Sequence, residues 1–156
     1  MKYPMAAIVH GLALLPSKMN TPQALVMILA IGGQESRFET RKQLGNGPAR
    51  SYWQFEQAGG VKGVINHAAT AELANKVCSL RGVACTPADV WRAMETDDVL
   101  GAAFTRLLLW TDPKPLPQLG NQESAWDLYK RTWRPGKPHP DTWPEMYASA
   151  MHELAA

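Results

Sequence analysis

Cysteine is scarce in this 156-residue chain, which holds only Cys78 and Cys85. Two cysteines are too few for the disulfide framework of a small secreted scaffold. In an oxidising compartment they would close the short loop CSLRGVAC as a disulfide; otherwise we expect two half-buried thiols. The sequence leaves both alternatives open.

Metal-binding and nucleotide-binding motifs are absent. The four histidines are scattered, and neither a His-x-x-x-His nor a Cys-x-x-Cys pair occurs. We therefore expect no bound metal. The pair Gly59-Gly60 lacks the Gly-x-Gly-x-x-Gly and Gly-Lys-Ser/Thr patterns that cradle nucleotide phosphates. We expect no cofactor.

No charge of one sign dominates, and no long hydrophobic run occurs. Sixteen basic side chains stand against fourteen acidic ones, for a net charge of +2. This balance does not indicate nucleic acid as a partner, which we do not expect, and it is compatible with an acidic polymer as substrate. No apolar run approaches the roughly 20 residues of a membrane span. The composition predicts a soluble protein.

The first twenty residues only partly resemble a secretory signal. An apolar run from Met5 to Leu15 follows Lys2, but His10 interrupts it, and no small-x-small cleavage site precedes Pro16. We interpret this segment as the first helix of the mature protein, without a signal peptide.

Residues typical of helix starts recur along the rest of the chain. Thr-Pro pairs at Thr21 and Thr86 place an N-cap residue before a proline that is well suited to the first helical position. Further starts are predicted near residues 96–98, at Asn121 and at residues 142–144. Two proline-rich connectors, at residues 113–117 and 134–144, are too short to separate domains. We predict one mainly α-helical domain over residues 1–156.

Residues 39–56 are the exception to the helical pattern. They contain two glycines and Pro48, followed by SYWQFE, in which aromatic and polar residues alternate. This pattern favours a small β-hairpin or an extended loop. If residues 51–56 form a strand, Tyr52, Gln54 and Glu56 share one face.

Glu35 occupies an unusual position for an acid. It lies in the last turn of the apolar helix that starts at Pro22, where the helix dipole disfavours a negative charge. Phe38, Trp53 and Phe55 supply apolar surface nearby in sequence. Burial and the dipole both raise the pKa of a carboxyl group, so that it can act as a proton donor near neutral pH. The alternative is a solvated surface charge.

Three segments carry a family resemblance: QESRF (34–38), ARSYWQFE (49–56) and AWDLYKRTWRPGKPHPDTW (125–143). Together they resemble the lysozyme-like superfamily of peptidoglycan-cleaving enzymes, especially soluble lytic transglycosylases and bacteriophage muralytic proteins. In those families a Glu-Ser pair ends a buried helix and a small hairpin lines the sugar cleft. Here Tyr52-Trp53 replaces the usual Leu-Met, and no Ala-Tyr-Asn-Gly-type motif follows.

The resemblance implies cleavage of the β-1,4 bond between N-acetylmuramic acid and N-acetylglucosamine, with Glu35 as general acid. A lytic transglycosylase uses this one carboxylate also as the base. A lysozyme-type hydrolase needs a second carboxylate. Glu39 and Glu56 are the candidates, of which Glu56 is better placed at the end of the hairpin. The single-acid route is the one that the resemblance favours.

Five further residues are candidates for substrate binding: Ser36, Ser51, Tyr52, Gln54 and Tyr129. Each has an ordinary structural alternative. Ser36 can simply cap a fraying helix end, and Tyr52 can pack in the core. Tyr129 either forms the apolar side of a helix with its tryptophan neighbours or, as the resemblance suggests, contacts Glu35.

The resemblance also implies a biological setting. The expected partners are peptidoglycan glycan strands, and also other virion proteins if a bacteriophage encodes the chain, which we expect to be a monomer in isolation. It would act from the virion or be released from the host cytoplasm to the cell wall. The basic cluster at residues 130–139 either attracts the acidic wall or is a solvated face. A non-catalytic structural or wall-binding protein of the same fold is the alternative from another class.

Overall fold

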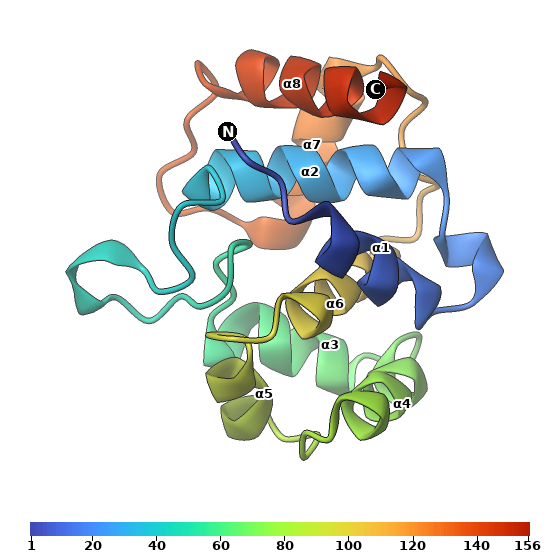
Figure 1. The fold of residues 1–156 in the computed structure, drawn as a ribbon, viewed down its shortest axis with the longest axis vertical. Helices are drawn as coiled ribbons and strands as arrows, with labels where there is room; N and C mark the ends of the chain where they lie inside the picture. The colour runs from blue at the N-terminus through green and yellow to red at the C-terminus, as the bar shows by residue number, and fades with distance from the viewer.

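The computed structural model describes all 156 residues and is mainly helical, with eight α-helices and no β-sheet (Figure 1). The predicted fold class is therefore confirmed. The α-helices are α1 (Met5–Ala13), α2 (Pro22–Ser36), α3 (Lys62–Asn66), α4 (Ala71–Arg81), α5 (Pro87–Ala93), α6 (Asp98–Trp110), α7 (Gln122–Trp133) and α8 (Trp143–Ala155). Three shorter helical turns are η1 (Ser17–Met19), η2 (Leu44–Asn46) and η3 (Gln57–Val61).

Side-chain caps start four of the eight α-helices at positions that the sequence predicts. The side-chain oxygens of Thr21, Thr86 and Asn121 each accept the backbone N–H three residues later, at the starts of α2, α5 and α7. Asp97 caps α6 in the same way. At the start of α8 the Thr142 side chain does not cap the helix. Local chemistry thus sets four of these starts.

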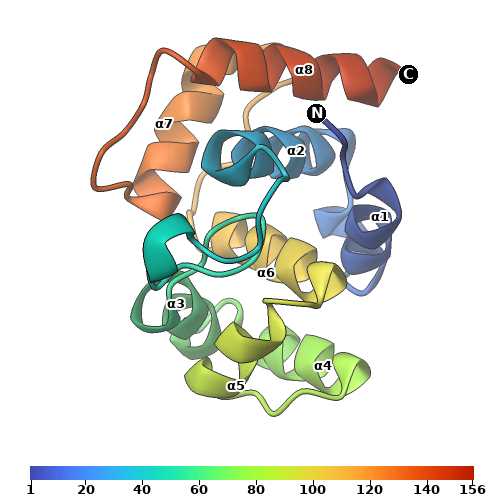
Figure 2. The same ribbon diagram turned by 60° about the vertical axis from the view of Figure 1, so that its left-hand side comes forward.

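Helix α2 lies at the centre of the molecule. In Figures 1 and 2 it runs between α8 on one side and α1 with α6 on the other, while α3, α4 and α5 cover the far side of α6. Nine of its fifteen residues are buried. The surrounding core is one cluster of 34 buried residues that extends from Ile8 to Ala150. The C-terminal end of α2 therefore leads directly out of the core.

The segment between α2 and η3 is an extended loop with a sharp turn. Two isolated antiparallel bridges, Lys42 with Arg50 and Arg50 with Phe55, are its only β-type pairing. Residues 51–54 form a turn in which Ser51 and Gln54 have left-handed backbone conformations. The alternative of a strand over residues 51–56 is therefore wrong, and the extended-loop alternative holds.

Internal hydrogen bonds anchor this loop to the helices. The Trp53 indole is completely buried and donates to the carbonyl of Ile28 in α2, over 2.9 Å. The carbonyl of Trp53 accepts from the Trp133 indole at the end of α7, also over 2.9 Å. The loop is consequently held against the middle of α2 and the end of α7, although it lacks a regular sheet.

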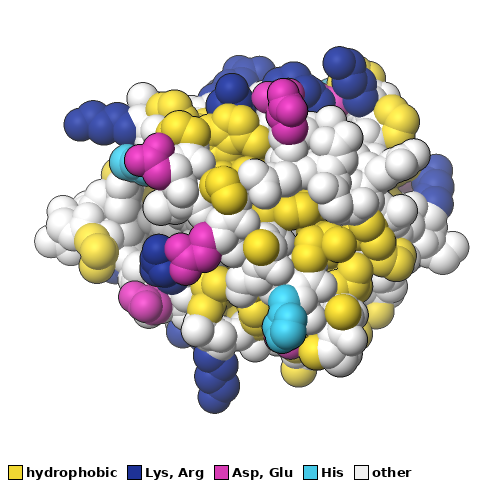
Figure 3. Space-filling view, turned by 90° about the horizontal axis from the view of Figure 1, so that it is seen from above, with side chains coloured by type: hydrophobic (Ala, Val, Ile, Leu, Met, Phe, Trp, Pro, Cys, Tyr) yellow, Lys and Arg dark blue, Asp and Glu magenta, His cyan; other side chains and the backbone are white.

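The surface of the molecule mixes apolar and charged side chains. Figure 3 looks onto the face formed by α8, where apolar side chains run between polar ones and most basic side chains lie toward the rim. No helix combines the length and the apolar character that a membrane span requires. Cys78 is buried, Cys85 is half-buried, and both thiols are free.

Candidate active site

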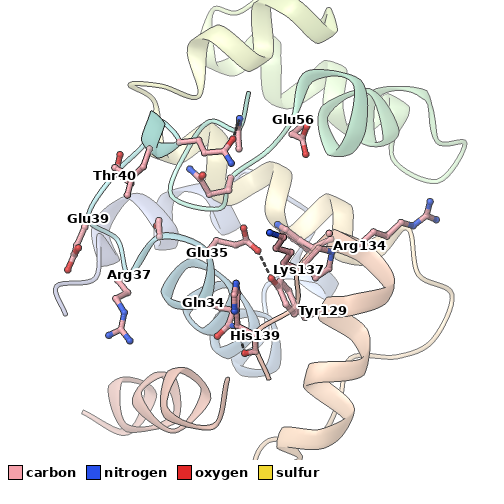
Figure 4. A pocket seen from close by; sticks show the side chains of 18 residues that line it. Gln34, Glu35, Arg37, Glu39, Thr40, Glu56, Tyr129, Arg134, Lys137 and His139 are labelled. Atoms are coloured by element: carbon pink, nitrogen blue, oxygen red, sulfur yellow. Dashed lines mark hydrogen bonds between the residues drawn. The ribbon is translucent and has the colours of Figure 1, made fainter. Parts of the chain in front are cut away.

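An open cleft of about 840 Å³ lies where the C-terminal turn of α2 meets the loop that follows it (Figure 4). One wall comes from α2 and residues 37–56. The other comes from the end of α7 and residues 134–139. Glu35, in the last turn of α2, points from the first wall toward Tyr129 of α7. The cleft therefore joins segments that are far apart in the chain.

Glu35 is largely sheltered from water, although it lines an open cleft. Burial raises the pKa of its carboxyl group from 4.5 to about 6, and the negative charge of Glu56 adds to this rise. A hydrogen bond from Tyr129 lowers the pKa but does not offset the burial. With this pKa about half of the carboxyl is protonated at pH 6 and about a tenth at pH 7, so a proton donor is present in this range.

Tyr129 is the direct partner of Glu35. Its hydroxyl donates a hydrogen bond to Glu35 Oε2, across 94 positions of sequence (Figure 4). The contact that the resemblance implied is thus present. Burial, together with the adjacent carboxylate, raises the pKa of Tyr129. The phenol therefore stays neutral and keeps its proton to donate.

An aromatic stack holds Tyr129 in place. Its ring lies parallel to the Trp143 ring of α8, with centroids 5.3 Å apart and an interplanar angle of 11°. Trp126 packs against both rings. The Trp143 indole donates to the carbonyl of Gln122, which ties α8 to the start of α7. This packing restricts the rotamer of Tyr129 and so the position of its hydroxyl.

Glu56 lines the same cleft across from Glu35 (Figure 4). It is exposed and forms no ion pair. Its negative charge acts through space on the Glu35 carboxyl and raises the pKa of that group. Glu39 also lines the cleft and is exposed.

Ser36 and Gln54 line the cleft while bonding to the backbone of the loop. The Ser36 hydroxyl donates to the carbonyl of Tyr52 over 2.6 Å and accepts the N–H of Phe38 over 3.1 Å. The Gln54 amide donates to the carbonyl of Ser51 over 2.9 Å. Ser36 thereby fixes the loop to the end of α2, and Gln54 keeps a carbonyl oxygen for other contacts.

The structure places Ser51 and Tyr52 outside the cleft. Ser51 is completely buried, and its hydroxyl accepts the backbone N–H of Trp53. The Tyr52 ring packs edge-on against Phe38, and the Arg41 guanidinium lies 4.5 Å from its centroid. Both residues pack within the loop behind the cleft wall.

Several cleft residues were not among the predicted site residues. Gln34, Thr40, Gln43 and Trp133 all line it. Gln34 adjoins Glu35 in sequence, and that adjacency is the one signal that points to it. Within the basic cluster, Arg134, Lys137 and His139 line the cleft, whereas Lys130 and Arg131 do not.

In comparisons with known proteins, no family model, no curated protein and no solved structure matches this chain. No three histidine, cysteine, aspartate or glutamate side chains gather as ligands for a metal ion.

Proposed function

We propose that this protein cleaves the β-1,4 glycosidic bond between N-acetylmuramic acid and N-acetylglucosamine in peptidoglycan, with Glu35 as general acid. The observation that supports this most directly is a carboxyl group with a pKa of about 6 inside an open cleft, hydrogen-bonded to a buried tyrosine. The lysozyme-like resemblance of residues 34–56 and 125–143 supports the choice of substrate.

The first chemical step is proton donation. Glu35 transfers its proton to the oxygen that bridges the two sugars, and the bond from that oxygen to the anomeric carbon breaks. The electron pair leaves with the oxygen, and an oxocarbenium-like centre develops on the muramic acid. Glu35 is then a carboxylate, which the Tyr129 hydroxyl stabilises by its hydrogen bond.

The second step uses the same carboxylate as a base. In a lytic transglycosylase it takes the proton from the C6 hydroxyl of the muramic acid, and that oxygen bonds to the anomeric carbon. The product is an anhydro sugar, and Glu35 is protonated again. No water and no second carboxylate enter this route.

A lysozyme-type hydrolase is the second candidate. The observation in its favour is that Glu56 lines the same cleft and raises the pKa of Glu35. In this route Glu56 would act as the second carboxylate on the opposite side of the sugar ring. Mass spectrometry of the fragments separates the two routes, because transglycosylation leaves anhydro-muramic ends and hydrolysis leaves reducing ends.

Clearing of purified cell walls tests the function itself. Glu35→Gln should reduce the rate of clearing by at least about 100-fold, the size expected of a lost general acid. Glu72→Gln, an exposed residue of α4 outside the cleft, is the matched control and should clear walls at the parent rate. Equal clearing by Glu35→Gln and the parent would refute the catalytic role. A folded parent that clears no walls would favour a structural or wall-binding protein instead.

The biological setting is part of the same proposal. A chain that cleaves peptidoglycan acts on the cell wall, and a bacteriophage protein would reach it from the virion during entry or from the host cytoplasm during lysis. We propose that the chain acts as a monomer on glycan strands, because all the residues that the mechanism uses come from one copy of the cleft.

A further inference from the structure

The strap between α7 and α8, residues 134–142, forms the wall of the cleft that lies across from the loop after α2. Most of its residues are exposed, and its prolines at positions 135, 138 and 140 exclude a regular helix. No residue from 135 to 138 makes a hydrogen bond or an ion pair. The middle of the strap therefore has no polar anchor of its own.

Gln34, in the last turn of α2, supplies an anchor at the far end of the strap. Its side-chain Nε2 donates to the carbonyl of His139 over 2.9 Å, and Figure 4 shows the two residues side by side. Its Oε1 accepts from the Thr142 hydroxyl, also over 2.9 Å. These are the only hydrogen bonds between the strap and α2. Both ends of one amide group are thus used to hold this wall.

The same helical turn carries both this amide and the proposed acid. Consecutive residues of an α-helix point about 100° apart, so Gln34 reaches the strap while Glu35 reaches Tyr129. Gln34 is not among the groups that shift the pKa of Glu35. Its two hydrogen bonds therefore act on the position of the wall and leave the charge state of the acid unchanged.

We propose that Gln34 is a positioning residue that holds the strap in place and so sets the width of the cleft for the glycan strand. This inference rests on the proposed function, because it takes the ligand of the cleft to be that strand. A wall that moves freely must be ordered each time a ligand binds, which weakens binding. The apparent affinity falls by the fraction of molecules whose wall is already in place, and Gln34 raises that fraction.

Kinetics of wall cleavage test this role through KM. Gln34→Met keeps the length of the side chain and removes both hydrogen bonds, so KM should rise by about tenfold. The value of kcat should stay within about twofold and the pH profile should not move, because the contact of Glu35 with Tyr129 remains. Thr142→Val removes one of the two bonds and should raise KM by about threefold. Thr142→Ser keeps the hydroxyl and should restore the KM of the parent.

Two matched controls change the same residue types away from this anchor. Gln23→Met alters a half-buried glutamine in the first turn of α2, and Thr132→Val removes a hydroxyl that bonds within α7. Neither residue lines the cleft, and both variants should keep the KM of the parent.

Backbone NMR order parameters of Lys137 and His139 test the anchor without any substrate. They should lie near about 0.85 in the parent and fall below about 0.6 in Gln34→Met. Order parameters that stay high in this variant, or a KM equal to that of the parent, would overturn the positioning role while the proposed function stands. A loss confined to kcat would overturn it too. If the parent cleaves no walls, the proposed function fails, and the role in glycan binding fails with it.

Discussion

Replacing Glu35 by glutamine should make the protein more stable at neutral pH while it removes the proposed activity. Burial raises the pKa of this carboxyl from 4.5 to about 6, so the folded protein disfavours its ionised form. Glutamine has nearly the same shape and can still accept the hydrogen bond from Tyr129. The variant therefore keeps the contact and loses the buried charge.

The sign and size of the effect follow from the pKa shift. Below pH 4.5 the carboxyl is protonated in both folded and unfolded chains and contributes nothing. Between pH 4.5 and about 6 the folded chain holds the proton more tightly, so the free energy of unfolding falls as the pH rises. The loss is essentially complete by about pH 7 and amounts to about 2 kcal/mol, at about 1.4 kcal/mol per pKa unit.

Thermal unfolding from pH 4 to pH 8 measures this effect. Glu35→Gln should match the pH dependence of the parent below pH 4.5 and gain about 4–8 °C in Tm above pH 6, the shift that about 2 kcal/mol produces in a domain of this size. Glu39→Gln changes an exposed glutamate on the same cleft and is the matched control, whose Tm at pH 7.5 should stay close to that of the parent. A Glu35→Gln variant that is less stable than the parent at pH 7.5, or whose difference does not change with pH, would refute a buried, proton-binding Glu35.

Three further substitutions test the parts around this acid. Tyr129→Phe removes the hydrogen bond that lowers the pKa of Glu35, so the alkaline limb of the kcat/KM profile should move to higher pH while kcat falls by roughly tenfold. Glu56→Gln should move the alkaline limb to lower pH. If the protein uses the single-acid route, this variant keeps most of its activity, whereas a hydrolase should lose about 10²–10⁴-fold in kcat. Gly32→Ala would place a methyl group 2.1 Å from Cζ of Phe38 and should cost about 1–3 kcal/mol in denaturant unfolding.

Each of these expectations has a result that contradicts it. A pH profile for Tyr129→Phe that moves to lower pH would mean that the phenol does not stabilise the ionised acid. For Glu56→Gln, reducing ends in the products of the parent together with full activity of the variant would exclude both proposed routes. Gly63→Ala, where the added methyl group meets nothing within 4 Å, is the control for Gly32→Ala. Equal stability of these two variants would contradict the tight packing at the end of α2.

The parts of the fold that depend on local chemistry could be predicted from the sequence. Thr21, Thr86 and Asn121 each bond to an N–H only three residues away, so the signal and the structure lie within one helical turn. The loop after α2 is different. Its alternating letters are typical of a strand, but the turn at residues 51–54 depends on the distant bond between the Trp53 indole and the Ile28 carbonyl. No pattern within the loop contains that information.

In the candidate site, too, only the features set by nearby residues could be predicted from the sequence. The position of Glu35 at the end of a buried helix follows from the cap at Thr21 and the apolar residues between them. The wall at residues 134–139 does not, because its bond to Gln34 joins residues 105 positions apart. Ser51 and Tyr52 were candidates because the resemblance placed them in the hairpin that lines the sugar cleft. Packing against the core, which sequence spacing does not reveal, turns them away from the cleft.

A single carboxyl group that first donates a proton and then accepts another must be able to hold both charge states. Burial alone would favour the neutral acid and make the carboxylate formed by the first step too unstable. The hydrogen bond from Tyr129 favours the ionised form, and the pKa of about 6 at Glu35 is the balance of these opposing effects. Because the pKa of Tyr129 is itself raised, the phenol stays a donor through both steps. The aromatic stack around Tyr129 thus supports the proposed single-acid route, because it holds that donor against Glu35.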